Sequence, residues 1–329
     1  MMRMTVLASG SKGNSTVISS GRTRVLVDAG LSCRELLRRM AAANEDPATL
    51  DAILITHEHL DHVAGLAVLA RRLRIPVFFT EPTHRAWVRM VTPRTTMSYT
   101  KWMEKKAQEK AAQVEAAASV ALAASAEHEA EQAVDDAEVQ LPVEPELDAI
   151  EERAAATKSD PAFLPAVEYF AAGKNFSIGD IGILPFTIPH DAADPCGFVF
   201  QAEGIRMALA TDLGYMPPNV KQALTGIDVL LLESNHDLEM LRDGPYPWSV
   251  KQRVLSRVGH LSNDAAAEFL AQDYDGGAAY IVLGHLSESN NAPELARLAA
   301  ERAIGDRMTL LGNRILLAEQ ARPLAPITL

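Results

Sequence analysis

The sequence HEHLDH at residues 57–62 contains four side chains that can bind a metal ion. Imidazole and carboxylate donors together suit zinc, and also manganese or iron. His57 and His59, two residues apart, can converge on one ion, while Asp61 and His62 can turn toward a second. A helix start needs only one such polar cap, not four. We therefore expect a metal site with ligands for two ions rather than a histidine-rich helix start.

Three further polar residues lie at the ends of apolar runs elsewhere in the chain. Each run has the length, the apolar content and the Gly or Pro punctuation of a buried strand. They are His190 after 183–189, Asp212 after 207–211 and His285 after 280–284. A side chain just beyond the carboxyl end of a strand points into the crevice where layered α/β folds place their sites. One such residue would more often be an ordinary loop residue, but the repeated placement predicts that all three join the histidine motif.

The order of these residues resembles the metallo-β-lactamase superfamily, in which HxHxDH is followed by a single His, an Asp and a late His. The resemblance implies one metal held by His57, His59 and His190. It implies a second held by Asp61, His62 and His285, with Asp212 bridging both. Asp28, which ends the apolar run 24–27, matches the superfamily's first motif and is expected to orient the metal-binding side chains.

Longer stretches resemble a bacterial group within this superfamily, the YycJ (WalJ) type of metal-dependent exonucleases. They are LASGSKGNS from Leu7, IPHDAADPCGFVF from Ile188, ATDLGY from Ala210, LLESNHD from Leu231, GHLSN from Gly259 and GHLSESNN from Gly284. These stretches span nearly the whole chain apart from one insertion. The resemblance implies a 5′-to-3′ exonuclease that acts on DNA.

The pattern of apolar residues predicts the elements that must position these side chains. Strands are expected near 4–8, 16–19, 23–28, 176–189, 197–202, 206–211, 228–233 and 279–284. Helices are expected near 32–43 and 62–73, where apolar residues recur at helical spacing. The predicted fold is α/β, a four-layered αββα sandwich of two mixed β-sheets flanked by helices, with the metals at the sheet edge.

The donor set suits phosphodiester hydrolysis. Two ions about 3.5 to 4 Å apart can activate a bridging water and stabilise both the attacking and the leaving oxygen. Attack by metal-bridged hydroxide is expected, with Asp61 or Asp212 accepting or orienting its proton. The developing negative charge also calls for a donor outside the metal ligands. The candidates are His260, in GHLSN, and His236, in LESNHD and oriented by Glu233; each could instead be a loop histidine that bonds to the backbone.

Length and composition agree with one catalytic domain over residues 1–329, since 48% of the residues are apolar and 22% are charged. No apolar run approaches the roughly 20 residues of a membrane helix, and no secretory signal is visible. We therefore expect a cytoplasmic protein without membrane contact. Cys33 and Cys196 are expected to be buried thiols rather than a disulfide. His84 and His128 have no supporting context and are expected at the surface.

Residues 93–166 form an acidic, Ala- and Glu-rich insertion in this domain. Between 101 and 160 there are 6 basic and 15 acidic residues, a net charge of −9 against −12 for the whole chain. The first part, to about 136, favours helix, and Pro142, Pro145, Pro161 and Pro165 then interrupt it. Too few apolar residues are present to build a separate core. We expect a helical or partly disordered insertion that could bind a protein partner.

The acidic balance argues mildly against a nucleic-acid ligand, because polyanion binding usually needs a basic surface. The excess acid lies in the insertion, however, and metal ions would supply positive charge at the site. Two local basic groups could line a groove or be ordinary solvated helix faces: Arg71, Arg72 and Arg74, and Lys251, Arg253 and Arg257. The turn 9–15 could offer backbone N–H groups, Ser11 or Asn14 to a phosphate, or be a plain turn.

Three classes of function remain open. The first is the DNA exonuclease with two divalent ions, zinc or manganese, with iron not excluded. The second is a hydrolase of a small phosphodiester, thioester or lactone that uses the same ions. The third is a non-catalytic regulatory or interaction protein that uses the acidic insertion. The complete ligand set favours an enzyme, because a scaffold does not need seven metal-binding side chains. A periplasmic β-lactamase is the weakest alternative, because no signal peptide is visible.

Overall fold

The computed structural model describes residues 1–92, 100–104, 106–107, 110, 160–305 and 312–329. The chain divides into two compact units, of which the first comprises Met1–Val91 and Pro161–Leu329 and the second Thr92–Asp160. Most of the second unit, including His128, lies outside the described residues. The first unit contains all the candidate site residues named above, and Leu164, which we assigned to the insertion, packs in its core.

The first sheet has seven strands in the order β14-β1-β2-β3-β4-β5-β6. Their bounds are Ile327–Thr328, Arg3–Ala8, Ser15–Ser19, Arg24–Val27, Ala52–Leu54, Val77–Phe79 and Val167–Tyr169. The strands β14, β1, β2 and β3 pair antiparallel. From β3 onward the pairing is parallel. The sheet is therefore mixed, and β3 is the strand at which its pairing changes.

The second sheet repeats this plan with the order β13-β12-β11-β10-β9-β8-β7. In that order the bounds are Arg314–Leu317, Tyr280–Gly284, Val229–Glu233, Ile205–Ala210, Cys196–Ala202, Ile181–Thr187 and Phe176–Ile178. The strands β7 to β10 pair antiparallel, and β10 to β13 pair parallel. Here the pairing changes at β10.

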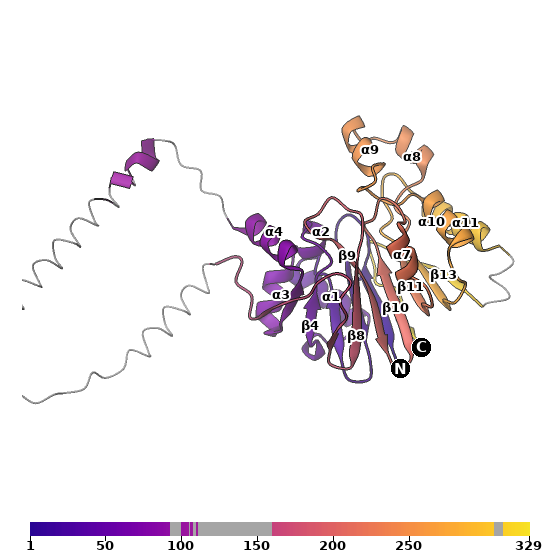
Figure 1. The fold of residues 1–329 in the computed structure, drawn as a ribbon, viewed down its shortest axis with the longest axis horizontal. Helices are drawn as coiled ribbons and strands as arrows, with labels where there is room; N and C mark the ends of the chain where they lie inside the picture. Colours follow the sequence, from indigo (N-terminus) through magenta and orange to yellow (C-terminus); the bar gives the residue numbers. More distant parts are fainter. Residues whose placement is uncertain (93–99, 105, 108–109, 111–159, 306–311) are drawn as a thin grey trace, which may run out of the picture. The chain divides into compact units, whose positions relative to one another are not determined.

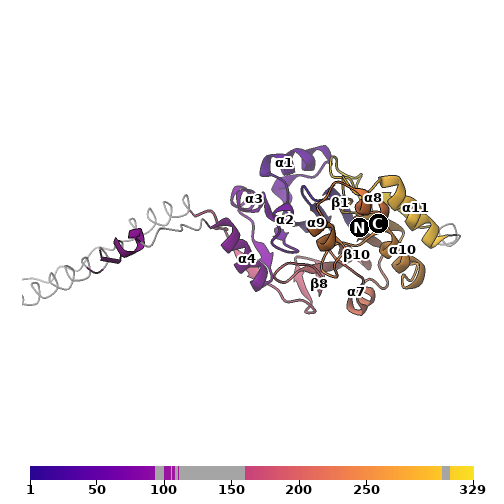
Figure 2. The same cartoon turned by 90° about the horizontal axis from the view of Figure 1, so that it is seen from above.

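Three apolar cores separate four layers. Side chains from both sheets, among them Val6, Phe198 and Leu231, form the central core. A second core packs the outer face of the first sheet against α1 (Cys33–Ala42), α3 (Leu66–Leu73) and α4 (Glu81–Val91). A third packs the second sheet against α7 (Pro218–Ala223), α10 (Asn263–Gln272) and α11 (Pro293–Ile304). The helices cover the two outer faces (Figures 1 and 2), which confirms the expected αββα sandwich.

The strands are apolar on both faces because each face meets a core. In β11, Val229 and Leu231 enter the central core, whereas Leu230 and Leu232 enter the outer one. Alternation of side chains along a strand produces this division. The two remaining short helices after β11, α8 (Leu238–Asp243) and α9 (Trp248–Val254), lie together at one end of the unit, beyond the sheets (Figure 1).

Two elements differ from expectation. The helix predicted over 62–73 is two helices, α2 (Leu60–Val63) and α3. They separate at Gly65, where a Cβ would lie 2.1 Å from the Leu31 carbonyl oxygen. The strand predicted over 176–189 is the hairpin of β7 and β8, which turns at Gly179 with φ of 55°. The spacing of apolar residues predicts neither the close backbone approach at Gly65 nor the turn at Gly179.

Cys33 and Cys196 are buried free thiols, as expected. Burial raises the pKa of Cys196 to about 12, so this thiol stays protonated at neutral pH. Among the described residues, no helix has both the length and the apolar character needed to cross a membrane.

Gly30 allows the loop after β3 to meet the metal-binding motif. A Cβ at this position would lie 1.6 Å from the Asp61 carbonyl oxygen and 2.6 Å from the Asn14 backbone nitrogen. Both contacts are with backbone, which cannot rotate away. We expect Gly30→Ala to lower the free energy of unfolding by about 3 kcal/mol, the upper range for overpacking, measured by urea denaturation.

Gly182→Ala is the matched control for this glycine. Its Cβ would meet only the Gln201 carbonyl oxygen, at an ordinary 3.6 Å, and we expect a change in unfolding free energy below about 1 kcal/mol. Equal effects of the two substitutions would show that the close approach at Gly30 does not limit stability.

Candidate metal centre

The candidate site residues lie at the carboxyl ends of strands, where the two sheets meet. In the first sheet, Asp28 follows β3 directly and the HEHLDH segment begins three residues after β4. In the second sheet, Asp212 lies two residues after β10, Glu233 ends β11 and His285 follows β12. Parallel strands bring these ends to one edge of each sheet, which agrees with the placement predicted from the apolar runs.

Three of these residues have left-handed backbone conformations, namely Asp28 (φ 61°), Asp212 (φ 61°) and His285 (φ 55°). Such a conformation costs a non-glycine residue of the order of 1 kcal/mol and persists only where the surroundings fix it. For His285 the fixing contacts are clear, because its N–H donates to Ser9 Oγ at 2.7 Å and its carbonyl accepts from Asn235 Nδ2 at 2.8 Å. The strand end is thus turned so that the side chain enters the site.

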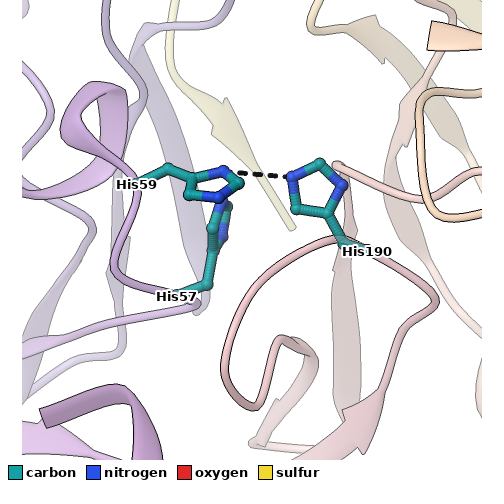
Figure 3. A group of neighbouring side chains, drawn as sticks. All are labelled: His57, His59 and His190. Atoms are coloured by element: carbon teal, nitrogen blue, oxygen red, sulfur yellow. Dashed lines mark hydrogen bonds between the residues drawn. The ribbon is translucent and has the colours of Figure 1, made fainter. Parts of the chain in front are cut away.

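One group of potential ligands consists of three histidines. Single ring nitrogens of His57, His59 and His190 all lie within 4.8 Å of one another. Figure 3 shows the three rings converging, with His59 Nδ1 3.2 Å from His190 Nε2. His57 Nε2 is buried and has no hydrogen-bond partner. Burial lowers the pKa of both His57 and His190, which keeps their lone pairs free at neutral pH. These features fit a metal cation.

The second group contains Asp61, His62, Asp212 and His285. His62 Nε2 lies 3.5 Å from Asp61 Oδ2 and 3.3 Å from Asp212 Oδ2, and His285 Nε2 lies 3.4 Å from Asp212 Oδ1. Burial opposes ionisation of Asp212, but His285 and His62 hold its pKa well below the usual range. Burial also opposes protonation of His62, yet Asp212, Asp28 and Asp61 raise its pKa well above 6.5. This pocket therefore favours positive charge, which a divalent ion would supply.

Asp28 supports the second group from behind. Its Oδ2 is 2.8 Å from His62 Nδ1, and Thr56 donates to both carboxylate oxygens, through its N–H and its hydroxyl, at 2.9 Å. Contact at Nδ1 leaves His62 Nε2 facing Asp61 and Asp212. Thr56 was not recognised from the sequence, where only its position one residue before the motif could have indicated a role.

Glu233 contacts His260 rather than the expected His236. The distance from Glu233 Oε1 to His260 Nδ1 is 2.7 Å, and Glu233 Oε2 accepts the Leu213 N–H at 2.7 Å. Burial would lower the pKa of His260, but Glu233 raises it to about 9. The His260 ring stacks on that of His285, with centroids 5.2 Å apart and an 18° interplanar angle. His260 is therefore cationic at neutral pH and lies beside the second group.

Among the described residues, a third group of potential ligands, Asp212, Glu233, His260 and His285, overlaps the second, and His236 joins none of the three. Its side chain is buried, its Nδ1 lies 3.3 Å from Asn235 Oδ1, and burial lowers its pKa to about 4. It is thus neutral at pH 7. Its backbone pairs with Ser262, which holds the segment after β11 beside the loop that carries His260. The Nε2 atom of His236 is buried and has no hydrogen-bond partner among the described residues.

Asn14 contacts the ligands themselves. Its Nδ2 lies 3.0 Å from His62 Nε2 and donates to Asp61 Oδ2 at 3.2 Å, while its Oδ1 accepts the Gly10 N–H at 2.8 Å. The turn 9–15 holds Asn14 against the second group, where its side chain bonds to Asp61.

The remaining candidates have separate surroundings. Arg71 and Arg72 lie in the last turn of α3, in an outer helical layer. Lys251 is buried and donates to the Arg242 carbonyl at 2.6 Å. Arg253 pairs with Asp191. His84, expected at the surface, is half-buried and lies 2.8 Å from the Tyr169 hydroxyl.

Comparisons with known proteins agree with this geometry. Residues 8–250 match the model of the metallo-beta-lactamase superfamily. Exodeoxyribonuclease WalJ of Streptococcus pneumoniae serotype 2 is 32% identical over 90% of this chain and 86% of its own. Exodeoxyribonuclease YycJ of Bacillus anthracis is 32% identical over 93% of this chain and 90% of its own. The metallo-beta-lactamase fold protein YhfI of Bacillus subtilis superposes with a TM-score of 0.60 at 14% identity, over 98% of this chain and 99% of its own.

The ion pair of His260 and Glu233 makes stability depend on pH. The folded-state pKa of His260, about 9, lies above its ordinary value of 6.5. The contribution is therefore complete below pH 6.5 and is lost as pH rises through about 9. Between pH 6.5 and about 9, we expect the unfolding free energy of the metal-free wild-type protein to fall further than that of metal-free His260→Gln. The difference between the two decreases should be at most about 3 kcal/mol. Urea denaturation across the pH range measures the difference, and parallel profiles of the two proteins would contradict it.

Proposed function

Because the chain belongs to the metallo-β-lactamase superfamily, we propose that it is a metal-dependent phosphodiester hydrolase and, specifically, a 5′-to-3′ DNA exonuclease. The observation that carries the proposal is the convergence of seven donor side chains into two adjacent groups. Two relatives that align over most of the chain are exodeoxyribonucleases. The fold alone does not establish the reaction, because one fold hosts many reactions. The metal-binding donor set supplies the evidence for this reaction at the level of the site.

The donor types and their grouping support two divalent ions per chain. His57, His59 and His190 offer three imidazole nitrogens to one ion. Asp61, His62 and His285 offer mixed donors to the other, and Asp212 has an oxygen toward each of His62 and His285. Nitrogen and carboxylate donors suit zinc or manganese, and iron is compatible with the same set.

Bound divalent ions would lower the pKa of a water molecule and stabilise charge on the phosphodiester oxygens. The protein's own residues do the rest of the work. Asn14 fixes the Asp61 carboxylate, which with Asp212 can accept or orient a proton. Glu233 keeps His260 protonated, so the ring N–H that does not face Glu233 can donate to negative charge that develops on the phosphate. His260 is thus the proposed catalytic donor, in place of His236.

The proposed substrate is compatible with the acidic composition. Of the net charge of −12, the stretch 101–160 carries −9. The rest of the chain is therefore close to balanced. We propose one catalytic domain, interrupted by the acidic insertion, acting on DNA in the cytoplasm. The possible protein partner of the insertion concerns residues outside the described part of the chain.

Digestion of end-labelled DNA tests the activity and its direction. The metal-loaded protein should remove nucleotides stepwise from the 5′ end of duplex or single-stranded DNA, as followed by gel electrophoresis. Asp61→Ala should show no detectable removal, because it lacks a carboxylate of the second group. His84→Ala, which changes a histidine bonded to Tyr169 away from the ligand groups, is the control that should retain the wild-type rate.

Two outcomes would redirect this proposal. Stepwise removal from the 3′ end would keep the nuclease and reverse its polarity. If the metal-loaded protein leaves DNA and RNA intact but hydrolyses small phosphodiesters or thioesters, the small-molecule alternative replaces the nuclease. Inactivity toward all of these substrates would favour the non-catalytic class.

Metal content tests the grouping of the ligands. The wild-type protein should bind two divalent ions per chain, measured by elemental analysis after dialysis against zinc or manganese. His59→Ala and His285→Ala should each lose about one ion, since each removes a donor from a different group. His84→Ala should keep two. Retention of both ions by His59→Ala, or loss of both by each single variant, would contradict two separate groups.

A further inference from the structure

The segment between α8 and α10 has a charge balance unlike that of the whole chain. Residues 245–263 include Lys251, Arg253, Arg257 and His260 and contain no acidic residue. The whole chain carries a net charge of −12. Lys251 is buried and Arg253 pairs with Asp191, so the exposed charge that this segment offers to a negatively charged ligand is that of Arg257.

The same segment exposes large apolar side chains. Trp248 is 67% exposed, Leu255 51% and Val258 43%. Large apolar side chains that are exposed within one short stretch of chain indicate a candidate binding surface. Apolar and basic side chains together suit nucleic acid better than a small anion, because bases need apolar faces and phosphates need positive charge.

Arg257 and Tyr215 supply a flat platform within this surface. The Arg257 guanidinium carbon lies 4.1 Å from the centroid of the Tyr215 ring. Arg257 is exposed, so a ligand can reach its side chain. Planar guanidinium groups and aromatic rings are the side chains on which unpaired bases stack.

The platform is tied to the proposed catalytic residues by short, packed connections. Tyr215 lies three residues after Asp212, and Arg257 three residues before His260. A Cβ on Gly214 would lie 2.4 Å from the Arg257 carbonyl carbon, so the two loops touch through their backbones. The Asp191 N–H donates to the Val258 carbonyl at 3.1 Å, which joins the loop of His190 to the same segment. Figures 1 and 2 show α9, which precedes Arg257, above the sheets and between the two outer helical layers.

We propose that Arg257 and Tyr215, with Trp248 on α9, form a base-stacking site that binds single-stranded nucleic acid and leads its end to the metal centre. The proposal rests on the proposed function and specifies its substrate as a strand whose terminal bases are unpaired. Bases in an intact duplex stack on one another and cannot reach a protein platform. Arg253 is paired with Asp191 and acts as part of the scaffold.

The test measures binding of a 5′-phosphorylated, single-stranded phosphorothioate DNA to the metal-loaded protein by fluorescence anisotropy. Phosphorothioate linkages slow cleavage, so binding is read separately from hydrolysis. We expect Arg257→Lys, which keeps the charge and loses the planar group, to weaken binding at least about fivefold. Tyr215→Leu and Trp248→Ala should weaken it similarly. Arg297→Lys, an exposed arginine on α11, is the matched control and should bind as the wild type does.

An oligonucleotide of the same length with abasic nucleotides near its 5′ end separates stacking from charge. The wild type should bind it more weakly, and Arg257→Lys should cause little further loss, because the base that stacks is missing. Equal losses by Arg257→Lys on both oligonucleotides would overturn the stacking site in favour of a phosphate contact. Unchanged binding by Arg257→Lys, Tyr215→Leu and Trp248→Ala would also overturn it. The stacking site would also be overturned if the wild type is a dimer that Trp248→Ala dissociates without changing DNA binding. In that case the surface around Trp248 binds a second copy of this chain.

The failure of this site can be told apart from failure of the nuclease. If the wild type degrades DNA while the three variants bind normally, the activity stands and the platform is wrong. If the wild type degrades neither DNA nor a small phosphodiester but shows the expected losses in binding, the platform stands and the hydrolytic function is wrong. Circular dichroism and metal content of each variant confirm that the fold and the ligands are retained.

Discussion

The buried carboxylate of Asp212 is the interaction on which the rest of the site depends. It lies just beyond β10, the strand at which the second sheet changes from antiparallel to parallel pairing. In the first sheet, Asp28 follows β3, where the pairing changes in the same way. Both residues have φ of 61°. Crevices form at such switch points because the connections on the two sides diverge. The fold thus places one buried acid at the corresponding point of each sheet.

Each half of the molecule also pairs a carboxylate with the Nδ1 atom of a histidine. Asp28 contacts His62 and Glu233 contacts His260, at 2.8 and 2.7 Å. The consequences differ because the surroundings of the other ring nitrogen differ. His62 Nε2 faces Asp61 and Asp212, where a metal would replace its proton. His260 Nδ1 lies 2.7 Å from Glu233 Oε1 and 3.9 Å from Asp212 Oδ1, and its pKa of about 9 keeps the ring protonated, which suits it to donate rather than to bind metal. The same carboxylate–histidine pair therefore positions a metal ligand at His62 and a proton donor at His260.

Much of this site was predictable because its signals are local. The four donors of residues 57–62 and the positions of His190, Asp212 and His285 at strand ends can be read from residue type and spacing alone. The pairing of Glu233 with His260 rather than His236 was not predictable. Both histidines lie in short loops near the acid, and the choice depends on a bridge between His236 and Ser262 that buries the former. Strands of three residues, such as β5 and β6, were missed because so short a run has no measurable period. The roles of Thr56 and Asn14 depend on backbone contacts between distant loops.

The net charge of the whole chain does not indicate the ligand, because it sums buried carboxylates at the metal-binding groups with charges on the exposed surface. The carboxylates around the metal-binding groups are buried and would be offset by the ions they attract, so they contribute little to the field that a nucleic acid meets. What a polyanion meets is the exposed surface beside the site, where Arg257 is exposed in a segment, residues 245–263, that contains no acidic residue. Stacking on Arg257 and Tyr215 also relies on planar faces rather than on summed charge. An acidic protein can therefore bind a strand of DNA if its carboxylates either are buried at the metal-binding groups or lie away from the path of the strand.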